Sequence, residues 1–264
     1  MKKVLTAVLA CILAVAAIGF AACNPQNSKT VKAGDKIIIG ITDYKPMDYI
    51  EDGKWVGFDA ELAEKVFTSL GYTTEFKEID WDTKIVTLNA GTIDVIWNGM
   101  TVTDELLENL LLSNVYLKNQ QVAVVKTENA DNYKTVSDLA GKKVAVESGS
   151  AAESAVNGLN ASEVSKLSNQ NSAVLNVSAG QADVAVVDYS LAKALTSEGT
   201  DYYGKLVMKE IGFAVENFSA ACRKSDSKLL WQINEELRKL EADGTIAALA
   251  EKYGISNQLP SNWN

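Results

Sequence analysis

The chain has 264 residues, with 25 basic and 34 acidic side chains, a formal net charge of −9 and no histidine. The lack of histidine excludes Ser-His and Cys-His nucleophile systems and histidine-ligated metal sites, and the acidic balance argues against a nucleic-acid partner. The sequence also has no glycine-rich phosphate loop and no CxxC pair, so we expect no catalytic residue, no cofactor and no metal.

The first 22 residues are expected to be a lipoprotein signal peptide. Two lysines begin the chain, Val4 to Phe20 is almost wholly apolar, and small residues lead to Cys23. The run Phe-Ala-Ala-Cys resembles a bacterial lipobox, in which the cysteine is lipidated and becomes the mature N-terminus. Residues 23–34 would then tether the protein to a membrane surface. The apolar run is also about the length of a short membrane span, so an uncleaved anchor is the alternative.

Removal of the signal peptide takes away two lysines and no acid, which leaves 23 basic and 34 acidic residues and a net charge of −11. The remaining chain, of about 240 residues, is long enough for two domains with cores of their own. Cys11 would be lost and Cys23 lipidated, so Cys222 has no cysteine left to pair with. We expect Cys222 to be a small buried apolar residue.

The first part of the mature chain alternates between strand and helix. Short apolar runs predict strands, and an apolar face that recurs every three to four residues predicts a helix. The expected elements are a strand over Ile37–Ile41, a helix over Asp59–Leu70, a strand over Thr73–Ile79, and a helix that begins after Asp80 or Asp82 and ends at Ala90-Gly91.

The stretch from 93 to 110, IDVIWNGMTVTDELLENL, predicts a strand, a polar turn and the start of a helix. Asn98-Gly99 breaks the apolar run, and Asp104 and Glu105 lie where the first turn of a helix favours acids. Ligands of open α/β sheets bind at the carboxyl ends of strands. This turn is therefore a candidate binding site.

A sequence similar to the start of this stretch recurs further along the chain. Residues 88–95 read LNAGTIDV and residues 177–184 read VSAGQADV, and the second copy continues into a strand that ends near Asp188. Two such helix–glycine–strand units indicate two α/β lobes of similar build.

The second half of the chain carries further strand and helix signals. Gln121–Lys126 is an apolar strand, residues 141–156 read as a strand, a glycine turn and a helix with Ser150 as its N-cap, and residues 225–244 form a strongly patterned helix. The positions expected to face inward on that last helix are Leu229, Ile233, Leu237 and Leu240.

Taken together, these motifs resemble the family-3 solute-binding proteins of bacterial amino-acid ABC transporters. The resemblance covers nearly all of the mature chain and is carried by GITDYKPM, GFDAELAEKV, IDVIWNGMTVTDE, GKKVAVESGS and ADVAVVDYS. It implies an α/β, two-lobed type II periplasmic-binding-protein (Venus flytrap) fold, with a mixed sheet flanked by helices in each lobe. One lobe would comprise residues 35–121 plus 212–264, and the other residues 122–211.

The resemblance also assigns binding roles to individual residues. Tyr44 and Trp81 would be aromatic walls around the ligand's side chain, and Asp188 would hold its α-ammonium group. Further contacts in a cleft between the lobes would come from Asn98, Gly99, Thr101 and Ser150. Aromatic walls and a carboxylate suit an amine on an apolar or extended stem.

One position departs from the family pattern. The family has T-x-[ED]-R after the turn, and its arginine clamps the α-carboxylate of the substrate. Here the arginine position is Leu106, and a second-lobe threonine of the family is replaced by Ala151. Glu147, at the end of a second-lobe strand, would add a second acid to the cleft beside Asp188.

Two interpretations of the ligand follow from this departure. The ligand is a cationic amine whose carboxylate is absent, modified or weakly bound, or it is an ordinary amino acid whose carboxylate meets helix N–H groups and a lysine such as Lys118. In both, the protein is a monomer on a lipid anchor that delivers its solute to an ABC permease. A ligand-sensing surface lipoprotein and a dehydratase-like enzyme, with Glu147 as its acid, are the alternative functions.

Overall fold

The computed structural model describes residues 34–261, so the predicted signal peptide, the lipidation site Cys23 and the tether up to residue 33 lie outside the described residues. Residues 34–261 form two mixed β-sheets with helices packed against them, which confirms the predicted α/β class. Within this range no helix is both long enough and apolar enough to cross a membrane. We refer to each sheet with its helices as the first lobe and the second lobe.

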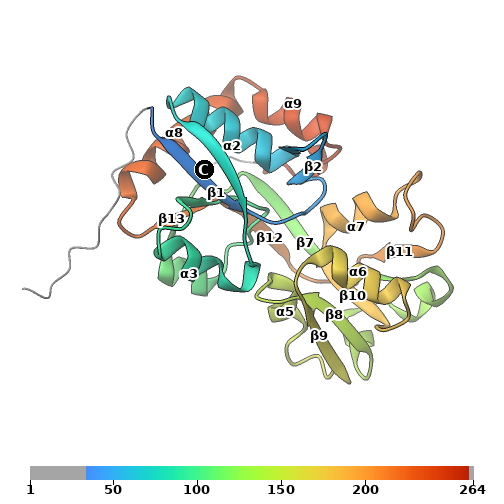
Figure 1. Cartoon of the computed structure of the whole chain (residues 1–264). Helices are drawn as coiled ribbons and strands as arrows, with labels where there is room; N and C mark the ends of the chain where they lie inside the picture. Colours follow the sequence, from blue (N-terminus) through green and yellow to red (C-terminus); the bar gives the residue numbers. More distant parts are fainter. Residues whose placement is uncertain (1–33, 262–264) are drawn as a thin grey trace, which may run out of the picture. The chain divides into compact units, whose positions relative to one another are not determined.

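The first lobe is built on a five-stranded sheet (Figure 1). Its strand order is β4 (Thr73–Glu78), β1 (Lys36–Ile41), β5 (Val95–Ile96), β13 (Ala221–Arg223) and β6 (Leu110–Leu112). β1 runs parallel to β4 and β5, whereas β13 is antiparallel to both of its neighbours. The helices of this lobe are α2 (Phe58–Ser69), α3 (Lys84–Asn89), α4 (Asp104–Asn109), α8 (Ser227–Ala242) and α9 (Thr245–Lys252).

The second lobe is built on a six-stranded sheet. Its main strand order is β11 (Leu206–Lys209), β7 (Leu117–Lys126), β10 (Val184–Asp188), β8 (Lys143–Glu147) and β9 (Glu163–Leu167), with β12 (Val215–Phe218) paired to β7. Its helices are α5 (Ala151–Val156), α6 (Gln170–Ser178) and α7 (Tyr189–Thr196). The remaining short elements of the chain are β2 (Tyr49–Glu51), β3 (Lys54–Val56), η1 (Trp81–Thr83), η2 (Thr127–Asn132), η3 (Val136–Leu139) and η4 (Ser256–Gln258).

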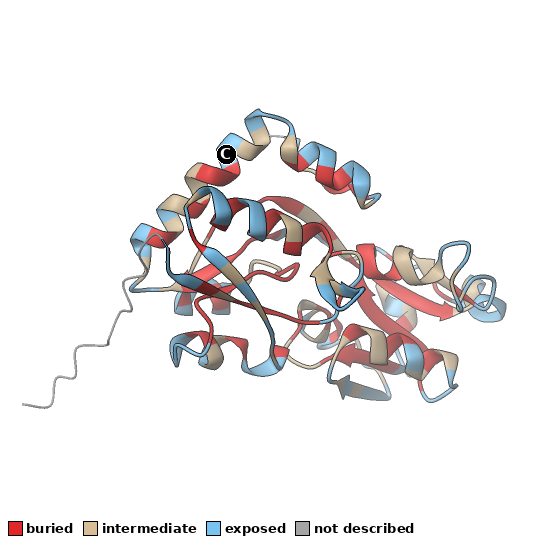
Figure 2. Ribbon diagram, turned by 45° about the horizontal axis from the view of Figure 1, so that its top comes forward, coloured by how far each residue is buried: buried red, intermediate tan, exposed pale blue. Residues whose placement is uncertain are grey.

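Alternation along the strands assigns each face of a sheet to its own helices. In β1, Ile37, Ile39 and Ile41 join the apolar cluster of α2, α8 and α9, while Ile38 packs on the cluster that contains α3 and α4. In β7, Val122 and Val124 pack with α6 and α7, and the intervening residues pack with α5. Both sheets are therefore covered on two sides, and Figure 2 shows buried residues along their central strands and exposed residues on the outer surfaces of the helices. The edge strands β4 and β9 are mostly exposed or half-buried.

β7 changes its pairing partner along its length. Residues 117–120 pair with β12, and residues 121–125 pair with β10. β12 is in turn bridged to the first lobe, where Phe218 pairs with Thr101. The change of partner lies beside the predicted lobe boundary at 121–122, and that boundary and the one at 211–212 stay predictions.

The two copies of Ala-Gly-x-x-Asp-Val fold in the same way. In each, a helix ends at a glycine with φ of +74°, a conformation that side chains other than glycine adopt with strain. Asp94 then donates its N–H to the carbonyl of Ile38 (2.7 Å) and accepts the Ile38 N–H on Oδ2 (3.1 Å). Asp183 makes the same pair of bonds with Lys143, at 2.9 and 2.8 Å. The aspartate thus aligns its strand with the neighbouring parallel strand, and the prediction of two lobes of similar build is confirmed.

Candidate functional site

A cavity of about 300 Å³ lies where strands of both sheets end, a size suited to a small molecule. From the first lobe it is lined by Trp81, Lys84, Asn98, Gly99, Met100, Thr101, Thr103, Asp104, Glu105 and Leu106. From β7 and the second lobe it is lined by Gln121, Glu147, Gly149, Ser150, Ala151, Ala152, Ser154, Gln170 and Asp188. The structure thus gathers seven of the eight predicted binding residues around one cavity.

The Asn98-Gly99 turn is held rigidly at the cavity wall. The side-chain amide of Asn98 accepts the N–H of Thr42 (2.8 Å) and donates to the Thr42 hydroxyl (2.7 Å). The N–H of Gly99 donates to Oδ2 of Asp59, an oxygen that also accepts the Tyr116 hydroxyl. Burial raises the pKa of Asp59 to about 7, against the lowering effect of these donors. The Asn98 side chain therefore holds the backbone just after β1.

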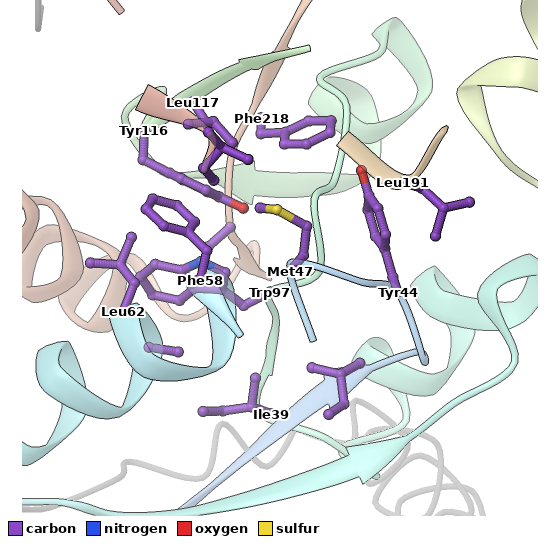
Figure 3. Close-up of a cluster of buried hydrophobic side chains, with 14 of the residues drawn as sticks. Ile39, Tyr44, Met47, Phe58, Leu62, Trp97, Tyr116, Leu117, Leu191 and Phe218 are labelled. Carbon is purple, nitrogen blue, oxygen red and sulfur yellow. The ribbon is translucent and has the colours of Figure 1, made fainter. Parts of the chain in front are cut away.

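Tyr44 is the one of the eight predicted residues that does not line the cavity within the described chain; it lies behind the lining residue Gly99. In Figure 3 its ring lies between Met47 and Leu191 in the buried cluster. Its hydroxyl shares a hydrogen bond of 2.7 Å with Ser190 of α7, so it joins the two lobes. A Cβ atom at Gly99 would lie 2.6 Å from the Tyr44 ring, so only glycine admits this packing.

Trp81 and Leu106 form the apolar part of the cavity wall. Both are buried in one cluster with Met100 and Ile96. α4 begins after Thr103, whose hydroxyl accepts the N–H of Leu106 at 3.3 Å. The position that carries arginine in the family pattern therefore supplies a packed leucine here, and the cluster around it offers no polar partner for a charge.

Lys84 is a cation of this cavity that the sequence analysis missed. It is only 7% exposed, and its ammonium lies 4.8 Å from the centre of the Trp81 ring. It donates to the carbonyl of Trp81 (3.2 Å) and, across the lobes, to that of Gly149 (2.8 Å). Burial lowers the pKa of Lys84, and nearby acids, Glu105 first among them, act in the opposite direction. Its spacing of three residues from Trp81 on a helical turn was the available sequence signal.

The lobes touch closely at Gly149. This residue has φ of +69°, and a Cβ atom there would lie 2.8 Å from the Cα atom of Asp82 in the first lobe. Its N–H donates to Glu153, which also pairs with Lys166 at 2.6 Å. Backbone atoms of the two lobes are thus in direct contact at the edge of the cavity.

Ser150 is the N-cap of α5, as predicted. Its hydroxyl accepts the N–H of Glu153 (3.2 Å) and donates to the carbonyl of Glu147 (2.7 Å). Ser150 therefore lines the cavity with a hydroxyl that is already engaged at both ends. The neighbouring residue on α5 is Ala151, whose methyl group adds no polar contact.

Asp188 ends β10 and is held by three side-chain amides. Its Oδ1 accepts Nε2 of Gln121 (2.7 Å) and Nδ2 of Asn119, and its Oδ2 accepts Nε2 of Gln170 (2.6 Å). Burial and the nearby Glu216 raise its pKa to about 6, while these three donors oppose the rise. No local sequence pattern predicts this set, because β7, α6 and β10 meet only in the folded chain.

Thr101 continues the same network on the side of the first lobe. Its hydroxyl donates to Oε2 of Glu216 at 2.9 Å, and that oxygen also accepts the amides of Asn119 and Gln121. The predicted residues Thr101 and Asp188 are therefore linked through β7 and β12, the two strands that pass between the lobes.

Glu147 ends β8, next to β10 in the sheet, and differs from Asp188 in having no donor. It is 4% exposed, lines the cavity, and its carboxyl group makes no hydrogen bond or ion pair within the described residues. Burial and the charge of Asp188 raise its pKa to about 8, and Lys84 acts in the opposite direction. The cavity thus contains one buried acid that is satisfied and one that is not.

Both arginines of the chain and Lys118 lie away from this cavity. Arg223 pairs with Asp94 and Asp226 in the first lobe, and Arg238 pairs with Glu235 on the surface of α8. Lys118, which the sequence analysis suggested as a carboxylate partner, lies on β7 beside a different surface pocket. Among the lining residues of the main cavity, Lys84 is the only basic side chain.

The chain matches the family described as bacterial extracellular solute-binding proteins, family 3, over residues 37–256. It belongs to this family, and the predicted two-lobed architecture and class of function are confirmed. It is 30% identical to the arginine-binding extracellular protein ArtP of Bacillus subtilis, over 92% of this chain and 96% of that protein.

Two solved structures give the same fold. A substrate-binding protein of an ABC uptake transporter from Streptococcus pneumoniae, with bound histidine, has a TM-score of 0.78 and 31% identity over 86% of this chain and 95% of that chain. An ancestral amino-acid-binding protein, described as a precursor of cyclohexadienyl dehydratase, has a TM-score of 0.76 and 32% identity over 83% and 95%.

The raised pKa of Glu147 predicts a specific pH dependence of stability. In the unfolded chain this carboxyl ionises above about pH 4.5, whereas in the folded chain it keeps its proton up to about pH 8. Folding therefore becomes less favourable as the pH rises through this window. We expect Glu147→Gln to raise the free energy of unfolding by on the order of a few kcal/mol at pH 8.5 and to change it little at pH 4.5.

Urea unfolding of ligand-stripped protein at the two pH values measures this difference. Glu108→Gln makes the same chemical change at an exposed position of α4 and serves as the control. An equal effect of Glu147→Gln at both pH values would show that folding does not raise the pKa of this carboxyl.

Proposed function

We propose that this protein is the extracytoplasmic binding component of an amino-acid ABC importer. It captures an amino acid in the cavity between its lobes and delivers it to a membrane permease. The observation that carries this proposal is the placement of Lys84 and of the two buried acids, Glu147 and Asp188, around one cavity of small-molecule size. An amino acid has one negative and at least one positive group, and both can be matched there.

Lys84 is the group that would bind the ligand's carboxylate. An ammonium has three N–H donors, and two of them are used on the carbonyls of Trp81 and Gly149. The third is left for a carboxylate, in a low-dielectric site where a charged hydrogen bond is strong. The carboxylate-binding role that the family pattern gives to an arginine at position 106 would then belong to Lys84 of α3.

The ligand would also favour the closed arrangement of the lobes. Lys84 and Trp81 belong to the first lobe, whereas Glu147 and Asp188 belong to the second, so one molecule between them is bound fully only when the lobes are together. A ligand stabilises the conformation that binds it better. The relatives named above support an amino acid as that ligand, since one is an arginine-binding protein and another holds histidine.

An enzyme is the second candidate, and Glu147 is the observation that favours it. A buried carboxyl group with a pKa of about 8 can donate a proton near neutral pH, and one structural neighbour is described as a precursor of a dehydratase. Family membership favours capture without turnover, so the bound molecule is expected to be recovered unchanged.

The expected ligand class can be tested by calorimetry on protein stripped of ligand by unfolding and refolding. We expect stoichiometric binding of at least one α-amino acid from a panel of L-arginine, L-lysine, L-histidine, L-glutamine and L-glutamate, with a Kd in the micromolar range or below. Mass spectrometry of the recovered ligand separates binding from catalysis. Failure of every amino acid to bind, or conversion of one to a product, would contradict the proposal.

The role of Lys84 can be tested with Lys84→Met and with Lys118→Met as the control. We expect Lys84→Met to weaken the binding of L-arginine by about 10- to 100-fold, the worth of a charged hydrogen bond, and Lys118→Met to change it little. The affinity of Lys84→Met for agmatine, which is arginine without its carboxylate, should fall much less. Equal losses of affinity for L-arginine and agmatine would show that Lys84 stabilises the contact between the lobes and does not bind the carboxylate.

A lipid anchor at Cys23, after removal of residues 1–22, would place this monomeric protein on the outer face of the cytoplasmic membrane. In a bacterial host we expect the wild-type protein in the membrane fraction, with a mass that includes acyl chains. Cys23→Ser should lack that mass. A wild-type protein whose N-terminus lies elsewhere, without acyl chains, would refute the anchor.

A further inference from the structure

The two buried acids of the cavity differ in how many hydrogen bonds they can still accept. A carboxylate offers about four acceptor sites. Asp188 already accepts three side-chain amide bonds, from Asn119, Gln121 and Gln170. Glu147 accepts none from the described residues, although it is 4% exposed and lines the same cavity. Asp188 has room for about one more donor, whereas Glu147 has room for a group that carries several.

Burial makes this difference costly. A buried carboxylate without a partner is destabilising, and its charge is tolerated only when another charge or a set of donors compensates for it. Asp104 and Glu105 also line the cavity, but both are exposed on α4, and water compensates for their charge. Glu147 is thus the lining acid whose charge depends most on what enters the cavity.

Charge balance points to the same conclusion. With both carboxyl groups ionised, the buried charged groups that line the cavity are Glu147 and Asp188 against Lys84, one negative charge in excess. An amino acid with a neutral side chain is a zwitterion; Glu147 keeps its proton beside such a ligand, because the excess would otherwise be left uncompensated. An amino acid with a positive side chain has a net charge of +1 and cancels it.

We propose that Glu147 is the acceptor for a positively charged side-chain group of the ligand, an ammonium or a guanidinium, and so determines specificity for basic amino acids. This rests on the proposed amino-acid-binding function and deepens it. Asp188 accepts one N–H of the α-ammonium, Lys84 meets the carboxylate, and Glu147 takes the distal cation. A guanidinium can bind a carboxylate through two parallel hydrogen bonds, which uses the open acceptor sites of Glu147 fully.

Ionisation of Glu147 would accompany binding. The charged groups that act on its carboxyl are Asp188 of β10, Lys84 of α3 and Asp80 before η1. Arrival of a cation favours the ionised form, so binding of a basic amino acid at pH 7 should release a proton to the buffer. Binding of a neutral analogue should not.

The experiment compares L-arginine with L-citrulline, in which an uncharged ureido group replaces the guanidinium at nearly the same shape. Calorimetry is done at pH 7 in two buffers of different ionisation enthalpy, on the wild type, Glu147→Gln and Glu108→Gln. We expect the wild type to prefer L-arginine by about 100-fold or more, in line with the cost of leaving one partner of a buried charge pair unpaired. We also expect release of a fraction of a proton or more on binding of L-arginine by the wild type.

In Glu147→Gln the preference should fall to within about 5-fold and the proton release should vanish, while Glu108→Gln should behave as the wild type. Comparable affinities of the wild type for L-arginine and L-citrulline would overturn this inference and leave the amino-acid-binding function standing. Agmatine tests the opposite case, in which the cation site exists but amino acids are not the ligand. If agmatine binds in a manner that depends on Glu147 while no amino acid of the panel binds, the cation site stands and the amino-acid function fails. If Glu147→Gln does not fold, the wild-type preference and its proton release decide the matter alone.

Discussion

The constraint on which the site depends is the burial of two carboxyl groups at neighbouring strand ends. Burial limits their contact with bulk water, so each is stabilised by donors, a counter-charge or a proton. Asp188 receives its donors from three amide side chains that β7 and α6 bring to it. Glu147 keeps its proton, with a pKa of about 8. The first arrangement stabilises the fold, and the second leaves a binding group that costs stability when ionised in an empty cavity.

Much of the fold was predictable because it depends on local pattern. Apolar alternation located β1, β4, β8 and β10 closely, and the repeated Ala-Gly-x-x-Asp-Val located a connection that the two lobes share. One element differs from the prediction for a physical reason. β7 begins at Leu117 rather than Gln121, because its first residues pair with a strand almost a hundred residues later. Leu240 packs against the core as predicted, although it is only partly buried near the end of α8.

The candidate site was predictable as a set of positions but less so as a set of contacts. The strand-end turn pointed to Asn98 as a binding position, and the family resemblance placed Glu147 and Asp188 in the same cleft. The side-chain partners follow from tertiary packing that no local pattern encodes. The amide of Asn98 is occupied by Thr42, and Tyr44 packs into the core. By sequence alone Lys84 would be taken for a surface residue, but in the folded chain its ammonium donates to the Gly149 carbonyl of the second lobe.

The close approach at Gly149 has a consequence for the speed of release. The lobes are held together by short-range contacts, among them Lys84 to the Gly149 carbonyl, Tyr44 to Ser190, Asn171 to the Asp43 carbonyl, Lys193 to the Gly254 carbonyl and the backbone of Asp82 against Gly149. Short-range contacts of this kind are lost within the first ångström or two of separation, whereas the attraction between opposite charges extends further. The free energy of opening would therefore rise steeply over the first ångström or two of separation and only gradually after that. Its residence time would be set by how often the lobes part slightly, and a permease that separates them at this one edge could shorten it greatly.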